Sequence, residues 1–169
     1  GLRPPFAAPG KGPAIRGNTK ARSTSRWPAT GVWTGLPPGG SPPDWLVHML
    51  GQAVAAYTDA THGHTLSAVS GAYYRLLIGR SEEAVKKFRQ LATAVWDIVP
   101  TGKTDKEIAL EGLARMEAWM RELGLAMDIT ACGADASQLE GMADACPINE
   151  SGYVVLTRED VIEVLRQSL

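Results

Sequence analysis

Apolar residues recur at intervals of three and four from residue 45 to the C-terminus. This spacing places them on one face of an α-helix. The pattern predicts a helix over about 45–57, with His48 in its middle, and a second helix that begins between 62 and 65. Three more helices are expected to follow Ser81, Thr104 and Thr157, a short one is expected over 135–145, and 153–156 is a brief extended piece. The body of the chain is therefore predicted to be all-α.

Local signals predict where several of these helices begin and end. Asp44 follows two prolines, which cannot continue a preceding element, and its carboxylate can accept hydrogen bonds from free helix N–H groups. Thr104 and Glu107 have the spacing of a capping box, in which each side chain bonds the other residue's backbone N–H. Gly124 is well placed to end the fourth helix in the left-handed conformation.

The first 43 residues differ from the rest in composition. They contain six basic residues and no acidic one, together with nine of the eleven prolines and eight of the eighteen glycines. We expect residues 1–26 to form an irregular or disordered basic lead and residues 27–169 to form the helical domain. Nucleic-acid binding by the lead is an alternative. An unstructured end is favoured, because few aromatic residues are interleaved and no nucleic-acid-binding fold follows.

Overall composition favours an ordinary soluble protein, with 44% hydrophobic and 21% charged residues and a net charge of -1. No apolar run has the length of a membrane span, and the N-terminus lacks the apolar stretch of a secretion signal. These features predict a cytoplasmic chain. Cys132 and Cys146 have no histidine at metal-site spacing near them, so we expect two reduced thiols.

The candidate chemistry lies in the three histidines, His48, His62 and His64. A helix, a tight reversal and a second helix can bring His48 and His62 into one pocket, and neutral imidazole binds borderline divalent metals. Two histidines alone are an incomplete site, however, because catalytic metals use about three protein ligands. On spacing alone, ordinary core or cap histidines are favoured. For His64 we favour a solvent-exposed cap over a place at the pocket mouth.

The residues around the histidines carry a resemblance. The segments DWLVHMLGQ (44–52) and HGHTLS (62–67) closely resemble the metal-binding segment of iron-containing alcohol dehydrogenases, in particular the butanol dehydrogenase and aldehyde reductase branch. The similarity continues in AVWDI (94–98), KTDKEIA (103–109) and GYVVL (152–156), and extends over about 27–169.

The resemblance implies a metal-dependent enzyme that interconverts primary alcohols and aldehydes by hydride transfer. Its members have an N-terminal α/β domain for NAD or NADP and a C-terminal helical domain, with Fe(II) or Zn held by one Asp and three His between them. Two of those three histidines correspond to His48 and His62. Family members often form homodimers, so a homodimer is a possible assembly.

Three features depart from the family pattern. Gln52 stands where many members have a histidine near the nicotinamide, and an amide cannot titrate. Residues 1–26 resemble the family poorly. No glycine-rich turn between a strand and a helix is present, so we expect the α/β domain to be absent, no cofactor-binding residue in this chain and no turnover by the chain alone. A helical interaction module without chemistry is the remaining alternative, and it predicts that His48 and His62 point apart.

Overall fold

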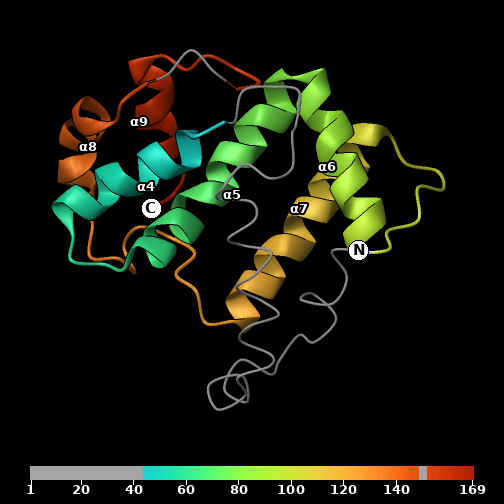
Figure 1. The fold of residues 1–169 in the computed structure, drawn as a ribbon, viewed down its shortest axis with the longest axis horizontal. Coiled ribbons are helices and arrows are strands. Elements are labelled where there is room, and N and C mark those ends of the chain that lie inside the picture. The colour runs from blue at the N-terminus through green and yellow to red at the C-terminus, as the bar shows by residue number, and fades with distance from the viewer. Residues whose placement is uncertain (1–43, 149–151) are drawn as a thin grey trace, which may run out of the picture. The chain divides into compact units, whose positions relative to one another are not determined.

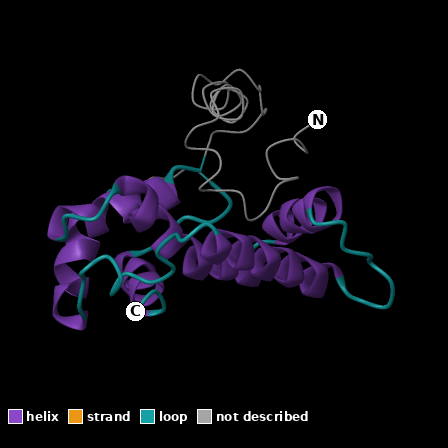
Figure 2. Ribbon diagram, turned by 90° about the horizontal axis from the view of Figure 1, so that it is seen from below, coloured by secondary structure: helices purple, strands orange, loops and turns teal. Residues whose placement is uncertain are grey.

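The computed structural model describes residues 44–148 and 152–169. The predicted lead, 1–26, and the start of the predicted domain, 27–43, lie outside these residues. Every regular element in the described ranges is helical (Figures 1 and 2), as expected. The elements are α4 (Leu46–Tyr57), α5 (His62–Arg80), α6 (Glu82–Val95), α7 (Asp105–Glu122), the short 3-10 helix η1 (Ala136–Gln138), α8 (Leu139–Ala145) and α9 (Arg158–Arg166).

Helix α5 lies at the centre of the described helices. It contacts α4 and α9 on one side and the α6–α7 pair on the other (Figure 1). Small and polar residues such as Ser67, Ser70 and Gly71 are buried along it as well as Val69 and Tyr73, so it has no wide polar face. A helix surrounded on most sides needs this composition, because small side chains let its neighbours approach closely.

The main core fills the space between α4, α5, α8 and α9. Its largest fully buried side chains include Leu46, Leu50, Tyr73, Met142 and Leu165. Burying a side chain of this size contributes about 1.5–3 kcal/mol. One smaller cluster lies between α5, α6 and α7. Another lies where α6 ends and α7 begins.

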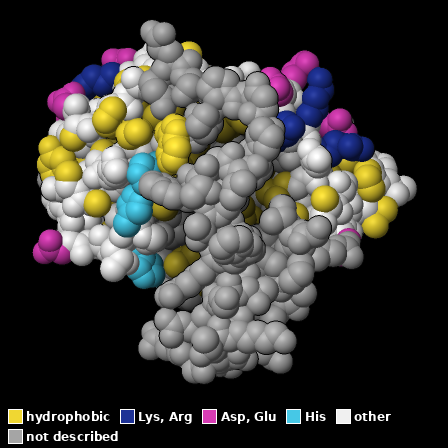
Figure 3. Space-filling view, in the orientation of Figure 1, with side chains coloured by type: hydrophobic (Ala, Val, Ile, Leu, Met, Phe, Trp, Pro, Cys, Tyr) yellow, Lys and Arg dark blue, Asp and Glu magenta, His cyan; other side chains and the backbone are white. Residues whose placement is uncertain are grey.

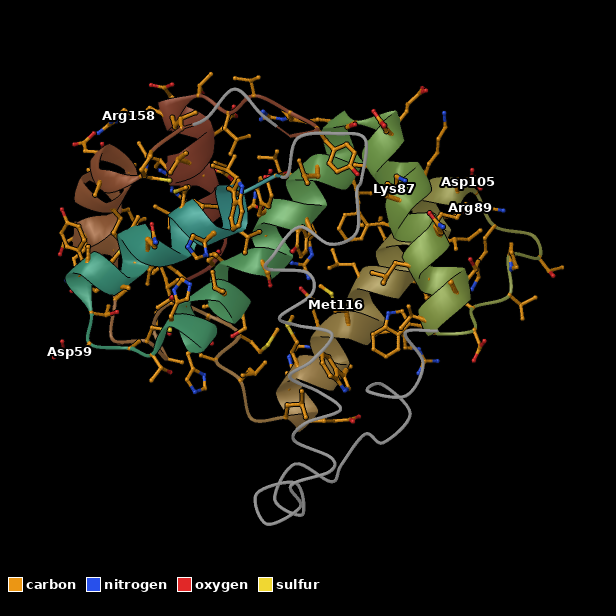
Figure 4. The ribbon with its side chains drawn as sticks, in the orientation of Figure 1. Asp59, Lys87, Arg89, Asp105, Met116 and Arg158 are labelled. Carbon is orange, nitrogen blue, oxygen red and sulfur yellow. The ribbon has the colours of Figure 1, made fainter. Side chains whose placement is uncertain are left out.

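The expected helix ends are present. The Thr104 hydroxyl accepts a hydrogen bond from the Glu107 N–H, and the Glu107 carboxylate accepts one from the Thr104 N–H, which completes the capping box. Ser81 caps α6 by accepting from the Ala84 N–H, and Gly124 has a φ of 75° directly after Leu123, the C-cap of α7. Arg89 of α6 forms an ion pair of 2.7 Å with the carboxylate of Asp105 at the start of α7, which links the two helices (Figure 4).

Three local expectations need correction. His48 is the third residue of α4 and lies in its first turn, not in the middle of the helix. The predicted helix over 135–145 is divided into η1 and α8, because Asp135 and Gln138 form their own capping box. The stretch 153–156 begins with bends at 153 and 154 and contains no strand.

Candidate metal centre

The imidazoles of His48 and His62 meet on one face of the α4–α5 pair. His48 Nδ1 lies 3.2 Å from His62 Nε2, and the ring centroids are 4.7 Å apart with the planes at 85°. Figure 3 shows histidine side chains at the surface of this face. His48 is half-buried and His62 is exposed, so the pair is open to solvent on the described surface. The geometry contradicts the alternative in which the two histidines point apart.

Local structure explains why the two rings meet. His62 is the first residue of α5, after a break of four residues, and His48 lies in the first turn of α4. Between the helices, Gly51 permits a close approach: a Cβ added there would lie 2.7 Å from Leu66 Cδ2 and 3.3 Å from the Leu66 backbone N. A larger residue at 51 would therefore separate the two helices close to the histidines.

Gln52 and Trp45 surround His48. Nε2 of the Gln52 amide lies 3.1 Å from His48 Nε2, and the Trp45 ring meets the imidazole edge-on with 5.6 Å between centroids. Trp45 is half-buried and packs against the ring of His48. A donor or acceptor on the second ring nitrogen fixes the tautomer and the orientation of a histidine. Gln52 therefore has a place in the site although it does not titrate.

The third histidine serves a different contact. His64 Nδ1 accepts a hydrogen bond of 2.9 Å from the backbone N–H of Ala126, in the segment that follows α7. His64 is half-buried, not a solvent-exposed cap as expected. It also borders a groove of about 710 Å³ with Asp59, Gly124 and Cys132. Its ring is thus part of the link between α5 and the loop at 123–135, which sequence reasoning did not identify.

A complete ligand shell is not found among the described residues. No group of three or more His, Cys, Asp or Glu side chains with metal-site geometry occurs in 44–148 and 152–169. Cys132 and Cys146 are free thiols, as expected, and both are buried. Burial raises the pKa of Cys146 to about 11, so this thiol stays protonated and unreactive at neutral pH.

The donor set nevertheless fits one divalent cation. With metal–nitrogen bonds of about 2.0–2.1 Å, two ligands in tetrahedral geometry have their nitrogens about 3.4 Å apart. The 3.2 Å between the His48 and His62 nitrogens is close to this value. The separation of the two nitrogens therefore fits their binding to one cation.

Comparisons with known proteins agree with this fold. The model for "Fe-containing alcohol dehydrogenase family, C-terminal" matches residues 40–169. The chain therefore belongs to the Fe-containing alcohol dehydrogenase family and matches its C-terminal part.

Two relatives come from Bacillus subtilis (strain 168). The probable NADH-dependent butanol dehydrogenase 1 is 30% identical over 90% of this chain and 39% of its own length. The probable NADH-dependent butanol dehydrogenase 2 is 33% identical over 75% of this chain and 33% of its own length. The chain thus spans well under half the length of these relatives.

Solved structures show the same helical fold. The NADH-dependent butanol dehydrogenase A of Thermotoga maritima superposes with a TM-score of 0.77 at 22% identity, over 89% of this chain and 39% of that one. The aldehyde reductase YqhD of E. coli gives a TM-score of 0.66 at 23% identity, over 76% of this chain and 33% of that one. In the described residues, no helix is both long enough and apolar enough to cross a membrane.

Proposed function

We propose that His48 and His62 are two protein ligands of a divalent metal, Fe(II) or Zn, in a metal-dependent alcohol dehydrogenase. The observation that carries the proposal is the 3.2 Å between His48 Nδ1 and His62 Nε2. Family membership over 40–169 supports it independently. When bound, such a metal acts as a Lewis acid that polarises an aldehyde carbonyl or stabilises an alkoxide.

The chain's own residues prepare this pair. His48 Nδ1 has to lose its proton to bind a metal, and the proton then resides on Nε2. A metal-bound histidine donates this second N–H to an acceptor, which holds the ring in place. The Gln52 amide lies 3.1 Å from Nε2 and can present its oxygen there after a half-turn of the amide group. We infer that Gln52 orients His48 but does not relay a proton.

The reaction we propose is hydride transfer between a nicotinamide cofactor and a primary alcohol or aldehyde. The relatives are named as NADH-dependent butanol dehydrogenases, which favours NADH over NADPH and a short-chain alcohol as substrate. The nicotinamide would be held by an α/β domain of the kind that family members have. A homodimer and a cytoplasmic location stay predictions.

Zn²⁺ binding by the purified 169-residue chain tests the proposal. In calorimetric titrations we expect one weak site, and His48→Ala or His62→Ala should each lower the affinity at least tenfold. His64→Asn is the matched control, because the Asn oxygen can still accept from the Ala126 N–H, and its affinity should equal that of the unchanged chain. Equal affinity in all three variants would refute the assignment.

Activity gives a second test. Catalytic metals are held by about three or more protein ligands, and the described residues bring two together. We therefore expect the 169-residue chain alone to oxidise butanol with NAD no faster than its His48→Ala variant. Turnover that depends on His48 would show that the remaining ligand and the nicotinamide site are also within these residues.

A further inference from the structure

The carboxylate of Asp44 links the start of α4 to α5. Its Oδ1 accepts a hydrogen bond of 2.9 Å from the Leu46 N–H, at the start of α4. Its Oδ2 accepts one of 2.6 Å from the Tyr73 hydroxyl, on α5. Gly152 approaches from the C-terminal part of the chain, and a Cβ added there would lie 3.0 Å from the carboxylate. Two hydrogen bonds therefore hold Asp44, and the helix-cap signal in the sequence predicted only the one at the start of α4.

This arrangement lies one turn before the candidate metal ligand. His48 follows Asp44 by four residues, so the start of α4 sets the height and rotation of the imidazole. Tyr73 belongs to α5, the same helix that carries His62 at its first residue. The hydrogen bond from Tyr73 to Asp44 thus fixes the beginning of α4 to the helix that carries the other imidazole.

We propose that Tyr73 is a positioning residue for the histidine pair, which it aligns through Asp44. This inference rests on the proposed function, in which His48 and His62 bind a metal. Without the Tyr73 hydroxyl, the start of α4 keeps the cap on Leu46 but loses its hydrogen bond to α5. His48 is then held less firmly relative to His62, and metal–ligand distances have to agree to within about 0.2 Å.

The surroundings of Tyr73 suit this role. Its side chain is fully buried, and burial, followed by the hydrogen bond and the charge of Asp44, raises the pKa of Tyr73 far above its usual value. The hydroxyl therefore stays protonated and donates to the carboxylate at any physiological pH. Partners that orient metal ligands from outside the ligand shell typically change metal affinity about 10- to 100-fold when they are removed.

Tyr74 provides a matched control. Both tyrosines and Asp44 border one cavity of about 350 Å³, whose wall also includes Lys87 of α6 and Met116 of α7 (Figure 4). Within the described residues, Tyr74 makes no hydrogen bond with the Asp44 carboxylate. Tyr73→Phe and Tyr74→Phe therefore remove the same atom from neighbouring positions, and only the first breaks the tie to α4.

The experiment compares these variants in the 169-residue chain in two ways. First, the imidazole ¹H and ¹⁵N signals of His48 and His62 are recorded without metal, with circular dichroism to establish that each variant is folded. We expect both sets of signals to move in Tyr73→Phe and to stay in place in Tyr74→Phe. Second, Zn²⁺ affinity should fall roughly tenfold in Tyr73→Phe, the low end of the range for such partners, and less than twofold in Tyr74→Phe.

Replacements of Asp44 show whether the contact positions the histidines or only stabilises the fold. They remain informative if Tyr73→Phe does not fold. Asn can cap Leu46 and accept or donate a hydrogen bond at the Tyr73 hydroxyl, so Asp44→Asn should retain the wild-type signals and affinity. Asp44→Ala should lose both. Unchanged histidine signals in folded Tyr73→Phe or in Asp44→Ala would overturn the inference. If the unchanged chain shows no His48-dependent Zn²⁺ binding, the proposed function fails, while the metal-free signals still decide whether Tyr73 positions the pair.

Discussion

The contact between α6 and α7 predicts a specific effect of a single methyl group. Gly112 of α7 lies against Ala92 of α6, and both residues are buried. A Cβ added at Gly112 would lie 2.5 Å from Ala92 Cβ and 3.0 Å from Ala92 Cα. The second of these is a backbone atom, so no side-chain rotation can relieve the overlap and the two helices have to move apart.

The magnitude follows from two opposing terms. Overpacking a well-packed contact costs about 1–3 kcal/mol, and an overlap with backbone belongs at the upper end. Replacing glycine by alanine inside a helix gains about 1 kcal/mol. We expect Gly112→Ala to lower the free energy of unfolding by about 2 kcal/mol.

Gly79→Ala in α5 is the matched control, because an added Cβ there meets nothing within 4 Å. It should raise the free energy of unfolding, by up to about 1 kcal/mol. Urea unfolding followed by circular dichroism measures both variants. The propensity gain is common to the two, so their difference of about 3 kcal/mol isolates the steric cost. If Gly112→Ala were as stable as Gly79→Ala, the close approach of α6 and α7 would be refuted.

Two ion pairs give further predictions. The Arg80 guanidinium beside Asp160 lowers the pKa of Asp160 from 3.8 to about 2. Because the folded pKa is depressed, the pair stabilises the fold fully above about pH 4, and this stabilisation is lost as the pH falls through 2. Arg80 is 46% exposed, so solvent screening reduces the effect. In urea titrations, Arg80→Ala should cost about 1 kcal/mol at pH 7 and much less at pH 2. An equal cost at both pH values would refute the pairing. Glu117 is 8% exposed and contacts Arg75 through both oxygens at 2.6 and 2.7 Å, so Arg75→Ala should leave a buried charge and cost about 2 kcal/mol. Adding Glu117→Gln should restore stability as measured by thermal unfolding, and a further loss in the double variant would contradict this reasoning.

Much of the fold was predictable because helix ends depend on neighbours in sequence. Thr104 and Glu107 bond each other across one turn, and Gly124 ends α7 through its own backbone conformation. The same locality explains why the two histidines could be nominated, since one helix, one short break and the next helix position them. A family resemblance carried by 44–52 and 62–67 added the expectation that they converge.

Contacts between distant segments were not predictable in the same way. Glu117 lies on α7 among charged residues, and only its pairing with Arg75 of α5 explains why it is buried. His64 meets the backbone of Ala126, and Tyr73 meets Asp44. Each of these contacts joins residues 29 or more positions apart, which periodicity within one helix cannot detect.

Burial along individual helices was also only partly predicted. Tyr57 and Leu123 continue the apolar stripes of α4 and α7 in the sequence, yet they are 43% and 40% exposed. Both lie at the end of their stripe, Tyr57 as the last residue of α4 and Leu123 directly after α7. The spacing of apolar residues shows which face of a helix is apolar. It does not show how far along the helix that face is covered by other elements.

The most direct test of the account is a Zn²⁺ titration of the metal-free chain, monitored by the imidazole ¹⁵N signals of all three histidines. We predict that the signals of His48 and His62 change together, with one common dissociation constant, because their nitrogens lie 3.2 Å apart. The signals of His64 should remain unchanged, because its Nδ1 is bonded to the Ala126 N–H. Independent responses of His48 and His62, with different dissociation constants, would contradict the claim that they bind one cation.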